Sequence, residues 1–192
     1  ADDPETSARA LARMFDAYTR GRIAPGRYYT SLSNDLHRYY RTLCVDYRFK
    51  VEEAGKRWAI RLLKLRHSRK LWHLANVATY CVAARVDDDD REPLLRRELG
   101  APPLWRVTWA MRQLGGLHLC APLLRAYDPF LAALADPATR AELDQLAHED
   151  RHRSAAFDAL YRNAEVFTRA THAIVEHLWT RCHDHLLRFA IL

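Results

Sequence analysis

The chain has little of what marks several common protein classes. Only six glycines and eight prolines occur in 192 residues, and Val and Ile are scarce beside Leu, Ala and Arg. That mixture favours helix and argues against a sheet. The most apolar run, from Leu71 to Ala84, has 14 residues and includes His73, whereas a bilayer-spanning helix needs about 20. We therefore predict an all-α protein with no membrane partner.

Cysteine is also sparse, and no two cysteines form a CxxC pair. A folded globule of this size, with 49% hydrophobic and 28% charged residues, does not need disulfides to build a core. Each cysteine lies in an apolar context typical of helix. We therefore expect free, buried thiols in a reducing cytoplasm. The four are Cys44, Cys81, Cys120 and Cys182.

Helical periodicity accounts for most of the chain. Ser31 or Ser33 is expected to cap a helix that runs to about Tyr47, and Asp136 to cap one that begins at the next residue. The solvated aspartates 87–90 are expected to follow the end of a long helix. The expected helices are 5–20, 31–47, 56–85, a short one before 101–103, 104–114, 122–134, one from 137, and 154–189. These predict a single helical domain over residues 1–192, a bundle of about six to eight helices.

Positive charge is concentrated in one part of the sequence. The chain has only four lysines against 26 arginines, and all four lie between Lys50 and Lys70. Residues 38–70 contain eleven Lys and Arg against three acidic residues, although the whole chain carries only +6. All the excess positive charge therefore lies in about one sixth of the chain.

The basic region is expected to lie along one long helix. On a helical period one stripe contains Arg57, Arg61, Lys64 and Ser68, and an adjacent stripe contains Arg69, His73 and Asn76. Like charges four residues apart repel, and a phosphorylated ligand or polyanion would relieve that repulsion. Lysine offers a mobile ammonium and arginine a rigid fork, both suited to phosphate. An anion site is the prediction, and a solvated basic face is the alternative.

Two segments carry a resemblance to a known family. NDLHRYYRTLCVDYRFK (34–50) and GKRWAIRLLKLRHSRKLW (55–72) resemble part of bacterial nucleotidyltransferase-like proteins, in which a helical domain follows the nucleotidyltransferase domain. The shared features are Asn-Asp entering a helix, Arg-Tyr-Tyr-Arg-Thr, Asp46-Tyr47, a Gly-Lys-x-Trp loop, and a basic helix ending in Ser-Arg-Lys-Leu. The resemblance covers about 40 residues. It implies a helical accessory domain that binds phosphate groups of a nucleotide or acceptor.

This chain lacks the sequence motifs of the catalytic domain of that family. It requires Gly-Ser on a turn and a nearby Asp-x-Asp to hold Mg²⁺ and a nucleoside triphosphate. There is no Gly-Ser here, and Asp-x-Asp occurs only inside 87–90. The chain begins without Met, so we expect a fragment that is C-terminal to a missing nucleotidyltransferase domain, without catalytic residues or a cofactor of its own. A complete mature protein is the other reading.

The predicted anion-binding set combines the basic stripe with the residues that match the family motif. Arg38 and Arg41 are expected to face the basic helix, and Asp46 to orient one of its cations. The sequence does not identify which nucleotide or which acceptor is bound. The full set is Arg38, Arg41, Asp46, Lys50, Lys56, Arg61, Lys64, Arg69 and Lys70.

Two other functions remain open for the same region. Helical RNases of the HEPN type pair an Arg with a His a few residues later, and Arg61-x5-His67 and Arg66-x6-His73 fit that spacing loosely. A nucleic-acid-binding domain without chemistry is the other alternative, because aromatic residues interleave with the basic ones as a stacking platform requires. These are Tyr39, Tyr40, Tyr47, Phe49, Trp58 and Trp72.

Two histidine-rich segments carry weaker metal signals. HEDRH (148–152) fits H-E-x-x-H, but charged residues fill its middle positions, so a polar, exposed turn is the prediction there. His172, Glu176 and His183 share a face of the last helix, where surface histidines are the ordinary reading. We therefore predict no metal ligands.

Overall fold

The computed structural model describes residues 4–20, 27–52 and 57–189. All regular structure in these residues is helical, which confirms the predicted all-α bundle. The main helices are α1 (Pro4–Thr19), α2 (Arg27–Glu52), α3 (Ala59–Lys64), α4 (Lys70–Ala83), α5 (Asp88–Leu99), α6 (Pro103–Gln113), α7 (Cys120–Ala135), α8 (Pro137–Gln145) and α9 (Ala155–Phe189). Shorter elements are the π-helical η1 (Leu65–Arg69) and the 3₁₀ turns η2 (Leu117–Leu119) and η3 (Arg151–Arg153).

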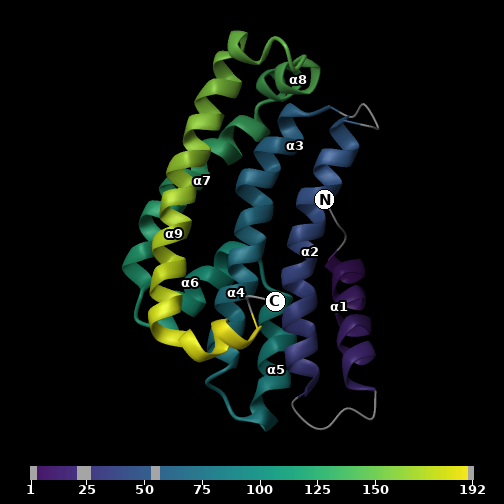
Figure 1. The fold of residues 1–192 in the computed structure, drawn as a ribbon, viewed down its shortest axis with the longest axis vertical. Helices are drawn as coiled ribbons and strands as arrows, with labels where there is room; N and C mark the ends of the chain where they lie inside the picture. The colour runs from purple at the N-terminus through teal and green to yellow at the C-terminus, as the bar shows by residue number, and fades with distance from the viewer. Residues whose placement is uncertain (1–3, 21–26, 53–56, 190–192) are drawn as a thin grey trace.

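The bundle is built around one central column. In Figure 1, α3 and α4 run end to end through the middle of the molecule, with α2 on one side and the long α9 on the other. Helix α4 packs mainly against α6, and α7 packs against α9. Helix α1 contacts α2 and α5, while α8 lies across the start of α3. Among the described helices, none combines the length and the apolarity that crossing a membrane requires.

The buried side chains form two clusters. The larger one fills the space between α3, α4, α6, α7 and α9 and includes Leu63, Phe130 and Phe167. The smaller one joins α1, α2, α4 and α5 around Phe15 and Leu32. Helix α4 contributes to both, which explains why its sequence is apolar on nearly every side.

Helix boundaries differ from the predictions at both ends of α2. The helix begins at Arg27, so Ser31 and Ser33 lie inside it rather than capping it. It continues to Glu52, beyond the predicted end at about Tyr47, and residues 53–56 lie outside the described part. Ser33 is fully buried, so it lies on the face of α2 that packs against the core.

The aspartates 87–90 are solvent-exposed and follow the end of α4, as predicted, and they also begin the next helix. Asp87 is the N-cap of α5, and Asp88, Asp89 and Asp90 occupy its first turn, where carboxylates interact favourably with the helix dipole. Arg91 then donates hydrogen bonds from its guanidinium to the Ala83 and Val86 carbonyls at 2.9 and 2.6 Å. The acidic run therefore starts a helix and fixes the corner between α4 and α5.

The predicted cap at Asp136 is confirmed, and one prediction for the cysteines is wrong. Asp136 caps α8, with its Oδ2 accepting from the Thr139 backbone N–H at 2.8 Å. Ser154 precedes α9, and its Oγ accepts from the Phe157 N–H at 3.0 Å. The cysteines are free, but Cys44 is exposed because it lies on the outer face of α2. The other three are buried, as predicted.

Candidate anion site

A π-helical turn changes the predicted basic stripe. The predicted helix from 56 to 85 begins only at Ala59, and its residues Leu65–Arg69 form a π turn. Because a π turn spaces hydrogen-bonded residues by five, Lys64 is followed on the same face by Arg69 rather than by Ser68. The structure therefore moves Arg69 from the adjacent stripe into the basic one.

His67 lies at the centre of this turn and packs into the core. Its side chain is fully buried and stacks on Phe130, with ring centroids 4.3 Å apart. Its Nδ1–H donates to the Leu63 carbonyl at 2.9 Å, which leaves Nε2 to accept from Asn163 at 3.3 Å. Seating this imidazole in the core is a physical reason for the extra residue in the turn.

The basic stripe lines a surface pocket with a cavity of about 460 Å³. One wall runs from Arg57, just before α3, along α3 to the end of η1, and the other comes from α8. Five of the lining side chains are cationic and one is a carboxylate. The pocket is lined by Arg57, Ile60, Arg61, Lys64, Arg69, Arg140 and Asp144.

Buried contacts hold α8 against α3 and so place the two walls. Trp58 is buried, and its Nε1–H donates to the Leu146 carbonyl just beyond α8 at 2.8 Å. Its ring also meets Phe157 of α9 edge to face, with centroids 4.8 Å apart. The pocket walls are therefore anchored by core packing rather than by the charged side chains themselves.

The pocket contains more positive charge than its own carboxylate neutralises. Asp144 forms an ion pair with Arg57. Among the described residues, no carboxylate forms an ion pair with the other four cations, Arg61, Lys64, Arg69 and Arg140. The first three are half-buried, so their charges are less screened than on an open surface. This is the arrangement expected of a site whose counter-ions come from a ligand.

The other predicted residues that the structure describes do not line this pocket. Arg38 is exposed and pairs with Asp35 at 3.7 Å, and Arg41 is also exposed on α2. The predicted roles of these two arginines as partners of the stripe therefore receive no support from the pocket geometry.

Asp46, Lys50 and Lys70 have partners elsewhere. Asp46 binds Lys50 one turn along α2, at 2.7 Å, rather than orienting a cation of the basic helix. Lys70 turns toward α9, where its Nζ donates to Thr168 Oγ1 at 2.8 Å, and burial lowers the pKa of its ammonium. Lys56 lies outside the described residues.

The structure adds α8 residues to the site that the sequence did not indicate. Arg140 and Asp144 lie more than 70 positions after the stripe that they face. They sit four apart on one face of an ordinary amphipathic helix. No local sequence signal distinguishes them from other surface residues.

The histidines proposed for RNA cleavage are poorly placed for it. His67 is fully buried, and burial lowers the pKa of its imidazole. His73 stacks on Tyr40 with centroids 4.5 Å apart, and burial, with smaller contributions from His37 and Arg41, lowers its pKa to about 4. Neither ring lines the basic pocket.

The metal-like motifs are surface features in this structure. Residues 148–152 form a turn and part of η3 rather than a continuous helix, so the H-E-x-x-H spacing does not place two imidazoles on one helix face. Both His148 and His152 are exposed, as predicted for a polar turn. Within the described residues, no three or more His, Cys, Asp or Glu side chains gather as a metal site would require.

No protein-family model matches this chain, and searches of curated proteins and of solved structures also found no match. The case for a function therefore rests on the pocket and on the sequence resemblance.

Proposed function

We propose that the protein binds the phosphate groups of a nucleotide or a phosphorylated acceptor in the pocket between α3, η1 and α8. One observation supports this most strongly. Four half-buried or surface cations converge there without a carboxylate partner among the described residues, beside the already paired Arg57 and Asp144. A phosphate group offers several acceptor oxygens and up to two negative charges, which suits such a cluster.

The role of this binding follows from the resemblance of residues 34–50 and 55–72 to nucleotidyltransferase-like proteins. We propose a helical accessory domain, with catalysis, Mg²⁺ and the nucleoside triphosphate belonging to a nucleotidyltransferase domain of the same full-length protein. Three of the predicted residues, Arg61, Lys64 and Arg69, line the pocket and so support this role. The chain alone would then bind its ligand without turning it over.

The experiment is a binding series with ATP, inorganic pyrophosphate and a 20-nucleotide single-stranded RNA. Thermal-shift and calorimetric measurements at 50 and 300 mM NaCl would report affinity for each. We expect saturable binding of ATP or pyrophosphate that persists at 300 mM NaCl, with no RNA cleavage. If neither compound binds at 50 mM NaCl, the proposed function is wrong.

A second candidate function, nucleic-acid binding, is favoured by the outer face of α2. Arg41 and Arg48 are exposed there beside Phe49, whose side chain is 54% exposed, and a base can stack on such a ring. Trp58, by contrast, is buried and holds α8 in place, so it cannot belong to a stacking platform. This candidate predicts RNA binding that weakens steeply between 50 and 300 mM NaCl, with little affinity for ATP.

A further inference from the structure

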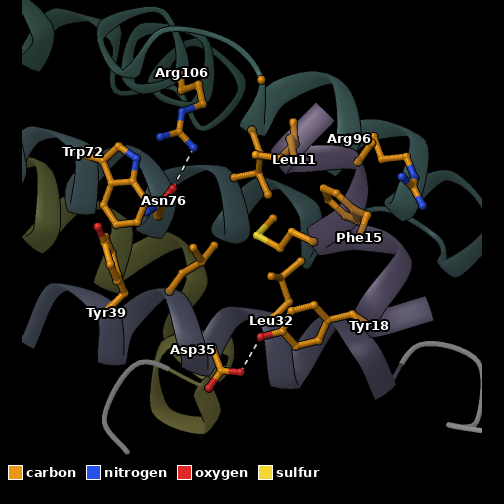
Figure 2. A pocket seen from close by; sticks show the side chains of 16 residues that line it. Leu11, Phe15, Tyr18, Leu32, Asp35, Tyr39, Trp72, Asn76, Arg96 and Arg106 are labelled. Carbon is orange, nitrogen blue, oxygen red and sulfur yellow. Dashed lines mark hydrogen bonds between the residues drawn. The ribbon is translucent and has the colours of Figure 1, made fainter. Parts of the chain in front are cut away.

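A second and larger pocket lies at the other end of the column, between α1, α2, α4, α5 and α6. Its cavity is about 1100 Å³, the upper end of what small-molecule sites need. Figure 2 shows aliphatic and aromatic side chains around it, and a guanidinium and an amide at one end. The apolar wall includes Leu11, Met14, Phe15, Leu32, Leu36 and Leu99.

Arg106 and Asn76 form the polar end of this pocket. Each side chain is only 2% exposed, and both line the cavity. The Arg106 Nη1–H donates to Asn76 Oδ1 at 2.7 Å, which is the dashed contact at that end of Figure 2. Arg106 Nε and Asn76 Nδ2 are buried donors without a hydrogen-bond partner.

The charge of Arg106 also lacks a direct partner. No carboxylate of the described residues forms an ion pair with it, and the neighbouring Glu98 instead accepts from Arg97 Nε at 2.8 Å. Burial lowers the pKa of Arg106 to about 10, with Tyr80 and Glu98 opposing that change, so the guanidinium stays cationic at neutral pH. A buried cation with unused donors is costly to a fold unless something else satisfies it.

We propose that this pocket binds a small organic monocarboxylate with an apolar body. Its carboxylate would accept hydrogen bonds from Arg106 Nε and Asn76 Nδ2, and its body would lie along the leucine-lined wall. Both free groups are donors, and an ionised carboxylate is an acceptor with two oxygens, so the chemistry is complementary. The site is separate from the phosphate pocket, and the proposal does not depend on it.

The charges around the pocket favour a monoanion over a phosphate ester. Arg96, the second cation in the lining, already pairs with Glu92 at 2.7 Å and lies over the Phe15 ring. Asp35 lines the pocket near Tyr18, which donates to it at 2.5 Å. The cavity is thus lined by one unpaired cation, Arg106, and by one carboxylate, Asp35. A phosphate monoester brings up to two negative charges, which is more than this single cation can neutralise.

The test uses octanoate, with octan-1-ol as the uncharged probe of the same chain length and octyl phosphate as the phosphate probe. Calorimetry on the whole chain would measure each affinity. We expect saturable octanoate binding, at least tenfold tighter than that of either other probe. The proposal is overturned if octanoate does not bind, if octanol binds equally well, or if octyl phosphate binds more tightly.

Three variants locate the binding. Arg106→Met should weaken octanoate at least tenfold and leave octanol unchanged, while the matched Arg96→Met should change octanoate affinity less than threefold. Leu36→Trp adds bulk to the half-buried wall and should weaken both probes, so it keeps the test decisive even if Arg106→Met does not fold. Octanoate binding that is unaffected by Leu36→Trp would place the ligand elsewhere and overturn the proposal. Pyrophosphate affinity should be unchanged in all three, which separates this proposal from the phosphate site.

Discussion

Neutralising two cations of the basic pocket tests the account of phosphate binding. The change is the double variant Lys64→Gln, Arg69→Gln, which removes two charges but keeps polar side chains of similar helix propensity. A hydrogen bond to a charged group contributes about 1.5–3 kcal/mol, and half-buried groups justify the lower value. Two such losses amount to about 3 kcal/mol, or roughly a 100-fold increase in the Kd for ATP or pyrophosphate.

The matched control removes the same charge from α2. This control is the double variant Arg38→Gln, Arg41→Gln, at two exposed positions outside the pocket. Salt at 150 mM should screen most of the interaction between these two charges and the ligand. We expect the control to raise Kd less than about threefold. Calorimetric titration gives both values, and thermal unfolding should show that both variants stay folded. Equal weakening in the two double variants would refute a localised site and leave only a diffuse basic surface.

Three further outcomes test the fold. Burial holds the pKa of His73 and of His185 at about 4. Unfolded histidines titrate near 6.5, so below that pH protons bind the unfolded chain in preference to the folded one. The stabilisation from each buried, neutral histidine is therefore complete above pH 6.5 and falls by about 2–3 kcal/mol toward pH 4. Urea unfolding measures this loss. An equal free energy of unfolding at pH 4.5 and pH 7 would contradict this burial. Ser154→Ala removes the acceptor of the Phe157 N–H and should lower the free energy of unfolding by about 1 kcal/mol, with no change in Kd for pyrophosphate. In the native protein only Cys44 should react rapidly with a thiol reagent, and Cys44→Ser should abolish that fast phase.

Local signals predicted the helices well because they depend on residues close in sequence. Asp136 and Ser154 each begin a helix, because their side-chain oxygens accept a hydrogen bond from the backbone N–H three positions later. The sequence placed the exposed aspartates 87–90 after a long helix, as the structure has them, but it did not show that they begin α5. Such residues suit both a solvated loop and the first turn of a helix. What decides between them is the contact of Arg91 with the end of α4, a tertiary interaction.

The candidate site was predicted only in part for a similar reason. Arg61 and Lys64 were placed on the basic stripe by helical spacing alone. Arg69 joins that stripe only because the π turn seats His67 in the core against Phe130, which no short-range pattern encodes. Arg140 reaches the pocket because Trp58 fixes α8 across the start of α3, which lies 81 residues before Arg140 in the chain.

The burial of Arg106 is a feature that the sequence did not predict. An arginine in an amphipathic helix reads as a surface residue, since buried guanidinium groups are rare. Its burial follows from α6 packing against α4, which brings it to Asn76. Asn76 in turn is one of the few polar residues of the largely buried helix α4, and its position there was a sequence signal for this pocket.

The most direct test of the central claim is a crystal structure of the chain with pyrophosphate. The account predicts a phosphate group between α3 and α8, within hydrogen-bonding distance of Arg61, Lys64 or Arg69. Pyrophosphate bound on α2, or an empty α3–α8 pocket at a saturating concentration, would contradict it.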